Sequence, residues 1–126
     1  MLSMSGFRRR AIRGSWIQLL VLSVLYERPM HGYRLLGEVN ELLAGRRTLK
    51  PGSLYTILRR MERSGLLKSE WEGRSSGLDR RVYRVSEMGM ERLREGRGMV
   101  EEQRRVLEKM AEFYHRHFEE AGDDRG

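Results

Sequence analysis

Residues 51–71 read PGSLYTILRRMERSGLLKSEW, and this stretch decides the fold. A proline in the first turn of a helix loses nothing through its missing N–H, so Pro51 marks a helix start. Apolar residues then recur at three- and four-residue steps, the spacing of one buried helical face. They are Leu54, Ile57, Leu58 and Met61. Gly65 can adopt the left-handed conformation that ends a helix, so the stretch predicts an amphipathic helix followed by a strand.

The other face of this helix is basic. At about 100° per residue, Thr56, Arg59 and Arg63 point away from the apolar stripe, with Tyr55 and Arg60 at its flanks. Arginine forks pair with guanine edges or phosphates, and threonine and tyrosine hydroxyls bind phosphates. The first turn around Ser53 offers backbone N–H groups to an anion. On this helix alone, DNA contact and an ordinary solvated surface are equally good interpretations.

Two further helices are expected upstream. The apolar run from Trp16 to Tyr26 is far shorter than the ~20 residues of a membrane span, and no cleavage site follows it. It is therefore interpreted as a buried helix that ends before Pro29, with Trp16 in the core. A second helix, closed by Gly45, is predicted by five residues that recur at three- and four-residue steps. These positions are Tyr33, Leu36, Val39, Asn40 and Leu43.

Two β-prone stretches, residues 66–72 and 80–85, follow the basic helix. Residues 73–79 separate them and are rich in glycine and serine, so we expect a hairpin with a flexible tip. Trp71 is expected to pack this hairpin against the helices. Three helices followed by a basic hairpin is the order of a winged helix-turn-helix, whose third helix enters the major groove of DNA and whose wing contacts the flanking backbone.

Charge favours the DNA interpretation. The 126 residues, one domain's worth of chain, carry 25 Lys+Arg against 18 Asp+Glu, for a net charge of +7. The basic excess lies in the N-terminal two thirds and attracts a polyanion. Arg74 near the hairpin tip and Arg80 and Arg81 in the second stretch add charge beside the basic helix. The alternative for Arg80 and Arg81 is pairing with Glu70 and Glu72 across the hairpin.

Catalysis has little support in the sequence. The chain has no cysteine, which excludes Cys-ligated zinc fingers and thiol chemistry. It also lacks a nucleophile motif, a phosphate-binding glycine loop and a compact carboxylate–histidine group. We therefore expect no enzymatic activity, no cofactor and no metal.

The last third of the chain predicts one long helix with Ser86 as its N-cap. Apolar residues at seven-residue spacing are typical of a helix that pairs with another helix. This seam is Leu93, Val100, Leu107, Met110 and Tyr114. Gly96 and Gly98 each cost about 1 kcal/mol relative to alanine within a helix, so we expect a bend there.

The expected fold is therefore mainly α, of the α+β class: a winged helix-turn-helix of three helices and a two-stranded wing, followed by a long C-terminal dimerisation helix. The predicted divisions are a basic N-terminal arm at 1–12, the DNA-binding domain at 13–85, the dimerisation helix at 86–121 and a disordered tail at 122–126.

Several motifs resemble the PadR family of transcriptional regulators. The most specific are Met30-His31-Gly32-Tyr33 and Pro51-Gly52-Ser53-Leu54-Tyr55 in this order and spacing, and the resemblance covers about residues 13–89. It implies a homodimeric, DNA-binding repressor in the cytoplasm of a bacterium or archaeon, of the short subgroup in which one long C-terminal helix pairs two subunits. It also implies that a small aromatic or hydrophobic effector releases the DNA.

The chain departs from the family pattern in two respects. Lys50 stands where a hydroxyl N-cap is common, so the cap is either lost or supplied by Thr48, and the lysine is free to contact a phosphate. No tryptophan follows Trp71, which argues against an aromatic ligand-stacking pore at the dimer interface.

We therefore expect a sequence-specific DNA-binding regulator whose partners are double-stranded operator DNA, a second copy of the chain and an effector, with no membrane. The expected DNA contacts are Lys50, Ser53, Tyr55, Thr56, Arg59, Arg60, Arg63, Arg74, Arg80 and Arg81. The alternative is a winged-helix protein-interaction module whose basic face docks an acidic partner.

Overall fold

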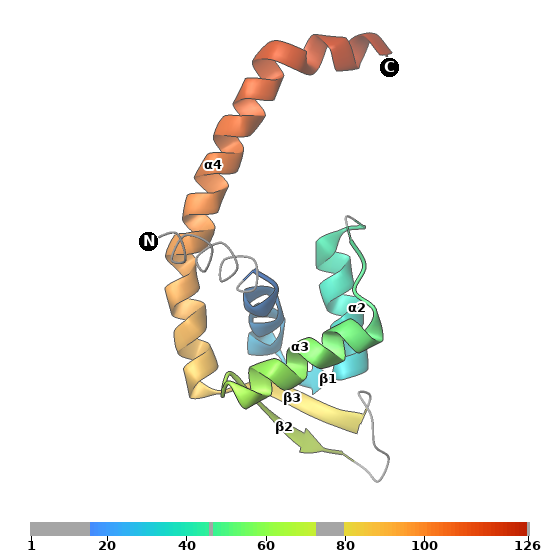
Figure 1. The fold of residues 1–126 in the computed structure, drawn as a ribbon, viewed down its shortest axis with the longest axis vertical. Helices are drawn as coiled ribbons and strands as arrows, with labels where there is room; N and C mark the ends of the chain where they lie inside the picture. Colours follow the sequence, from blue (N-terminus) through green and yellow to red (C-terminus); the bar gives the residue numbers. More distant parts are fainter. Residues whose placement is uncertain (1–15, 46, 73–79, 126) are drawn as a thin grey trace, which may run out of the picture. The chain divides into compact units, whose positions relative to one another are not determined.

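The computed structural model describes residues 16–45, 47–72 and 80–125. Residues 16–27 form the first helix, the unlabelled blue coil in Figure 1. The elements that follow are β1 (Met30–His31), α2 (Gly32–Leu43), α3 (Pro51–Arg63), β2 (Leu67–Trp71), β3 (Arg81–Val85) and α4 (Glu87–Arg125). The protein is thus mainly helical with one small antiparallel sheet, and the predicted winged-helix fold is confirmed.

The sheet contains the predicted hairpin and one further strand. Its strands lie in the order β1-β3-β2, and both pairings are antiparallel. Strands β2 and β3 form the wing, in which Ser69 lies opposite Tyr83 and Trp71 lies opposite Arg81. The wing tip, residues 73–79, lies outside the described residues. Strand β1 was not predicted, because a two-residue strand has no periodicity and only its pairing with β3 defines it.

The core beneath α3 follows the predicted stripe. Leu54, Leu58 and Met61 are fully buried, and Ile57 is half-buried. The other buried apolar residues come from the first helix, α2, the sheet and the turn after α3, among them Leu22, Leu25, Leu35, Val39, Leu66 and Tyr83. This packing fixes which side of α3 faces solvent.

The second predicted helix is confirmed as α2, but the residues that predicted it do not all lie on its buried face. Leu35 and Val39 are buried, whereas Tyr33 is 68% exposed and Leu36 is half-buried. Adjacent leucines at 35 and 36 make two face assignments possible at helical spacing. The orientation of α2 against the other helices selects Leu35, and this choice is a tertiary effect.

The two tryptophans are not core residues. Trp71 is 52% exposed and Trp16 is 42% exposed, so the prediction that both are buried was wrong. Trp71 is the last residue of β2, where the wing extends away from the helices, and the guanidinium of Arg81 covers its ring at 4.0 Å from the ring centroid. A charged side chain therefore replaces the expected helix contact.

The ends of α2 and α3 and the start of α4 have the turn and cap residues that terminate or begin a helix. Gly65 follows α3 with φ +84°, which confirms the predicted left-handed cap. After α2, Ala44 already adopts φ 53° and Gly45 φ 78°, so the left-handed turn begins one residue before the predicted glycine. The N-cap role of Ser86 is confirmed, because its Oγ accepts a hydrogen bond from the Gly89 N–H at 3.0 Å and donates to the Gly65 carbonyl.

Helix α4 is continuous from Glu87 to Arg125, so Gly96 and Gly98 do not interrupt it. It passes the predicted end at 121, and residues 122–125, expected as a tail, are helical. The chain divides into two compact units, Met1–Arg94 and Glu95–Gly126, and the division falls within α4. The first turns of α4 belong to the first unit, where Arg92 Nη1 donates to Gln18 Oε1 at 3.0 Å.

Candidate nucleic-acid interface

The start of α3 has no side-chain cap. Lys50 occupies the N-cap position in an extended conformation, and no side chain, that of Thr48 included, caps the helix. Pro51 has no N–H, so the backbone N–H groups of Gly52 and Ser53 remain for an external acceptor. Lys50 and Ser53 are exposed beside them. Of the two alternatives, a lost cap and a cap supplied by Thr48, the structure has the first, which leaves a positive helix end that suits an anion.

Asn40 of α2 holds the segment that leads into α3. Its Nδ2 donates to the Leu49 carbonyl at 3.1 Å, and the Leu49 N–H donates to its Oδ1 at 2.8 Å. Leu49 is itself buried. Asn40 is one of the residues whose spacing predicted α2, but this hydrogen-bonding role was not predicted. The only signal in the sequence is an amide side chain at a core-facing position. The two hydrogen bonds fix the residue that precedes the uncapped end.

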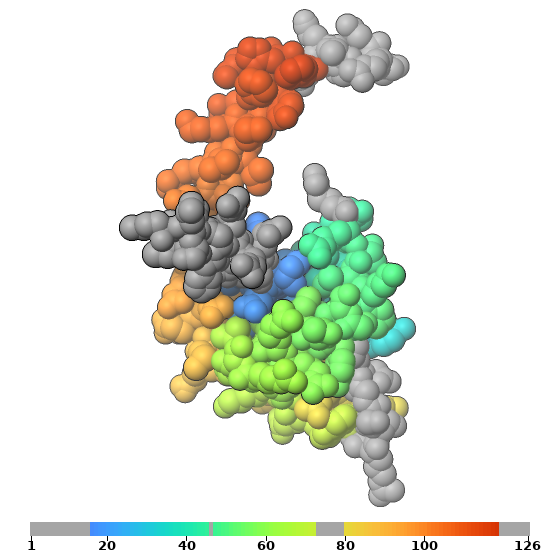
Figure 2. All heavy atoms as spheres, in the orientation of Figure 1, coloured from blue at the N-terminus to red at the C-terminus, as the bar shows by residue number. Residues whose placement is uncertain are grey.

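The outward face of α3 carries the predicted groups. In Figure 2 the green spheres of α3 lie on the near face of the winged-helix unit. The exposed side chains are Tyr55, Thr56, Arg59, Arg60 and Arg63. Within the described residues, no ion pair joins any of the three arginines to a carboxylate. These cations therefore remain available to a polyanion.

Two local contacts orient this face. The Arg59 guanidinium lies over the Tyr55 ring, 5.5 Å from its centroid. Thr56 Oγ1 donates to the Gly52 carbonyl at 3.1 Å, so its hydroxyl is left to act as an acceptor. Tyr55 thus supports an arginine, and Thr56 is better suited to a base amino group than to a phosphate.

A cleft of about 490 Å³ separates α3 from the wing. Its lining residues are Tyr55, Arg59, Glu62, Arg63, Arg81 and Tyr83. Burial raises the pKa of Tyr83, and the nearby Arg81 acts in the opposite direction, so its hydroxyl stays protonated at neutral pH. Three guanidinium groups against one carboxylate make the cleft positive.

The wing arginines have different surroundings. Arg80 is exposed, whereas Arg81 is half-buried and its Nη1 donates to Ser69 Oγ at 2.7 Å. Arg74 lies outside the described residues. The alternative pairing of Arg80 and Arg81 with Glu70 and Glu72 is wrong, because Glu70 pairs with Arg84 at 2.7 Å and Glu72 with His31 Nε2 at 2.9 Å.

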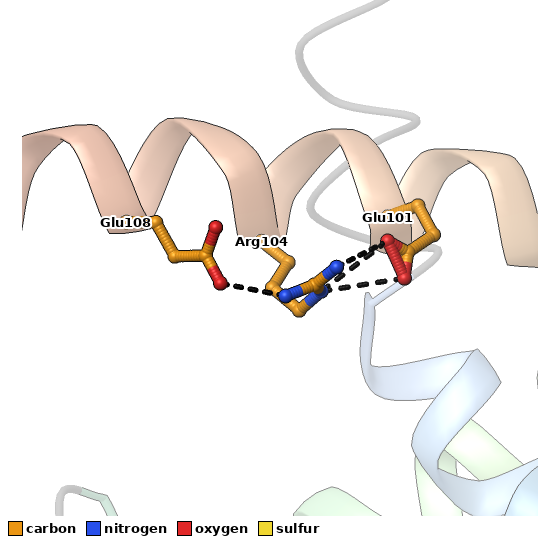
Figure 3. A network of polar contacts seen from close by, with 3 residues as sticks. All are labelled: Glu101, Arg104 and Glu108. Atoms are coloured by element: carbon orange, nitrogen blue, oxygen red, sulfur yellow. Dashed lines mark hydrogen bonds and ion pairs between the residues drawn. The ribbon is translucent and has the colours of Figure 1, made fainter.

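The predicted seam on α4 is largely exposed. Leu93 is half-buried in the first unit, and Val100, Leu107, Met110 and Tyr114 are exposed in the second. Val106, Phe113 and Phe118 widen this apolar face. Beside it, Arg104 binds Glu101 and Glu108 (Figure 3), and its hydrogen bonds lower the pKa of the Glu101 carboxyl. The face is therefore apolar with a charged edge, as in helices that pair.

Residues 21–95 match the model of the transcriptional regulator PadR-like family. The chain is 37% identical over 108 residues to the transcriptional regulator Rv3488 of Mycobacterium tuberculosis, which covers 86% of each chain. No helix in the described ranges has the length and apolarity needed to cross a membrane.

Solved structures show the same architecture. A PadR family regulator from Eggerthella lenta is 31% identical with a TM-score of 0.61, over 86% of this chain and 92% of that one. Another from Clostridium difficile is 30% identical with a TM-score of 0.58, over 78% of this chain and 97% of that one.

Proposed function

This chain belongs to the transcriptional regulator PadR-like family, and on that premise we propose that it binds operator DNA as a homodimer and represses transcription. The observation that carries the proposal is the outward face of α3, where three arginines face solvent without a carboxylate partner in the described residues. An arginine fork reads guanine bidentately in the major groove, which an α-helix of this size can enter. The proposed function is therefore recognition of specific DNA sequences.

The contacts divide into base reading and phosphate binding. Thr56, Arg59, Arg60 and Arg63 are the proposed readers of the groove. The first, second and last of these lie on the side of α3 opposite its buried stripe, and Arg60 is exposed at the flank. Lys50, Ser53 and Tyr55 lie at the first turns and are the proposed phosphate contacts, together with Arg74 and Arg80 of the wing.

A second copy of the chain is the proposed partner of α4. Large apolar side chains in the second unit, among them Leu107, Phe113 and Tyr114, remain exposed. Burying such a face against its own copy gives a two-fold dimer, and two-fold helix-turn-helix dimers in general bind half-sites about 34 Å apart. We further propose that a small aromatic or hydrophobic effector releases the DNA, and that the protein acts in the cytoplasm.

The test is selection of bound fragments from a random DNA pool, followed by binding measurements with Arg59→Ala and Arg63→Ala. If either arginine makes a bidentate guanine contact, its variant should lose about 1 to 3 kcal/mol on the selected operator and much less on random duplex. Arg105→Ala removes one exposed charge from α4 and is the matched control.

Two results would count against the proposal. Equal losses on operator and random DNA would reassign the arginine to phosphate binding. Absence of any enriched sequence, together with binding of acidic peptides by the same face, would favour the protein-interaction module instead.

A further inference from the structure

A polar cluster joins the wing to α3. Ser69 Oγ of β2 donates to Glu62 Oε2 of α3 at 2.5 Å and accepts a hydrogen bond from Arg81 Nη1 of β3 at 2.7 Å. The same Nη1 lies 3.8 Å from Glu62 Oε2. Glu62, Ser69 and Arg81 are here called the wing bracket. It connects three separate elements through one serine hydroxyl.

The guanidinium of Arg81 is occupied by these contacts. It lies over the Trp71 ring, and its side chain is 28% exposed, against 33% for Glu62. A phosphate contact through Nη1 would compete with Ser69 for the same nitrogen. Arg80, its neighbour in sequence, is exposed and has no such partner among the described residues. The two adjacent arginines therefore have different roles.

The bracket is placed where the wing leaves the core. Leu67 at the inner end of β2 is buried, whereas Trp71 at the outer end is half exposed. Tyr83, opposite Ser69 on β3, is also buried, so the core holds the wing as far as this pair of residues. None of the described wing residues beyond the pair is buried. The link from Ser69 to Glu62 adds a polar contact between β2 and α3 at the point where the buried part of the wing ends.

The bracket also controls a carboxylate in a basic cleft. Glu62 lines the cleft together with Arg59 and Arg63, where an unpaired carboxylate would repel a DNA phosphate. The hydroxyl of Ser69 and the charge of Arg81 hold it toward the hairpin. The cleft thereby remains favourable to a polyanion.

We propose that Ser69 and Arg81 are positioning residues, which act through Glu62 to set the angle between the wing and α3, and that Arg81 does not bind DNA. This inference rests on the proposed function, because the angle matters only if α3 and the wing contact one duplex together. Its effect should be confined to the operator, where both contacts must be made in register.

The decisive variant is Ser69→Ala, which removes the central hydroxyl and changes no charge. Operator affinity should fall about ten- to a hundredfold, the order expected for one hydrogen bond to a charged group, with a smaller loss on random duplex. The slope of log affinity against log salt should stay at the wild-type value. Ser69→Thr keeps the hydroxyl and should restore binding.

Arg81→Ala is compared with Arg80→Ala across the same salt series. Arg80→Ala should lower the salt slope by about 0.9 for each subunit engaged, as expected for one lost phosphate contact. Arg81→Ala should reduce operator affinity and leave the slope unchanged. Arg81→Lys keeps the charge without the planar fork, so it should behave like the alanine variant.

A second measurement follows the wing directly. In a Trp16→Phe background, Trp71 is the only tryptophan. Ser69→Ala should change its emission, because the guanidinium above the ring is no longer held by the hydroxyl. If Arg81→Ala does not fold, Ser69→Ala, Ser69→Thr and the emission measurement decide the question.

Two outcomes overturn the inference and leave DNA recognition standing. One is a salt slope that falls as much for Arg81→Ala as for Arg80→Ala. The other is wild-type operator binding by Ser69→Ala. Failure of the proposed function looks different, because the wild-type protein itself would then show no operator and no salt-dependent binding of duplex DNA.

Discussion

Replacing Gly89 with alanine should destabilise the protein, although alanine favours helices. Gly89 is buried in the first turn of α4. A Cβ on it would overlap the Leu66 carbonyl oxygen and lie 2.8 Å from Val85 Cγ1 and 3.1 Å from Leu22 Cδ2. The Leu66 carbonyl accepts a hydrogen bond from the Ser86 N–H, so it cannot move away without loss. The glycine thus allows α4 to approach the end of α3 closely.

The size of the effect follows from two opposing terms. Overpacking a core usually costs about 1 to 3 kcal/mol, and the upper part applies because the obstacle is backbone. The better helix propensity of alanine stabilises the folded protein by at most about 1 kcal/mol. A net loss of about 2 kcal/mol should lower Tm by roughly 8 °C in a domain of this size.

Gly37→Ala is the matched control. Gly37 lies within α2, and an added Cβ there meets no atom within 4 Å. Only the better helix propensity of alanine then acts, so the free energy of unfolding of this variant should rise by about 0.5 to 1 kcal/mol and its Tm by a few degrees. Both variants are followed by far-ultraviolet circular dichroism at one protein concentration, because dimerisation makes Tm concentration-dependent. Shifts in the same direction for the two variants would refute the close-packing argument.

Three further predictions concern the dimer, the α3 start and the sheet. Val100→Asp combined with Leu107→Asp should give monomers in sedimentation, whereas Arg105→Asp on another side of α4 should leave the dimer intact. Dimers in both cases would contradict the assignment of the seam as the dimer interface. Asn40→Ala removes both hydrogen bonds to Leu49, so the free energy of unfolding, measured by thermal denaturation, should fall by about 1 to 3 kcal/mol and operator affinity should also fall. A fall in the free energy of unfolding below about 0.5 kcal/mol would be inconsistent with the role of Asn40. Burial raises the pKa of Tyr83 above 10.0, so the folded protein keeps the neutral form while the unfolded chain ionises, and stability should fall as pH rises through and above 10. The Tyr83→Phe variant has no hydroxyl to ionise, so its stability should fall less over this pH range. Parallel curves of stability against pH for the two proteins would exclude a contribution from Tyr83.

Local periodicity was sufficient for much of the fold and for the basic face. The stripe of α3 and its solvent face depend only on residues three and four positions apart, so the helix geometry alone separates Leu58 from Arg59. Gly65 and Ser86 were predictable for the same reason, because caps are short-range hydrogen-bonding and backbone requirements. The sequence by itself therefore determined that a basic helix and a hairpin stand next to each other in the chain.

Only the tertiary structure decided what each charged side chain does. Arg80 and Arg81 are adjacent and chemically identical, yet Arg81 binds Ser69, which lies 12 positions away in the sequence. The register of the hairpin brings Arg81 opposite Trp71, and the packing of α3 brings Glu62 to the same place. The orientation of α2 and the pairing of β1 were decided in the same way. An arginine can pair with a phosphate or a carboxylate equally well, so its role depends on which group the folded chain places within hydrogen-bonding distance.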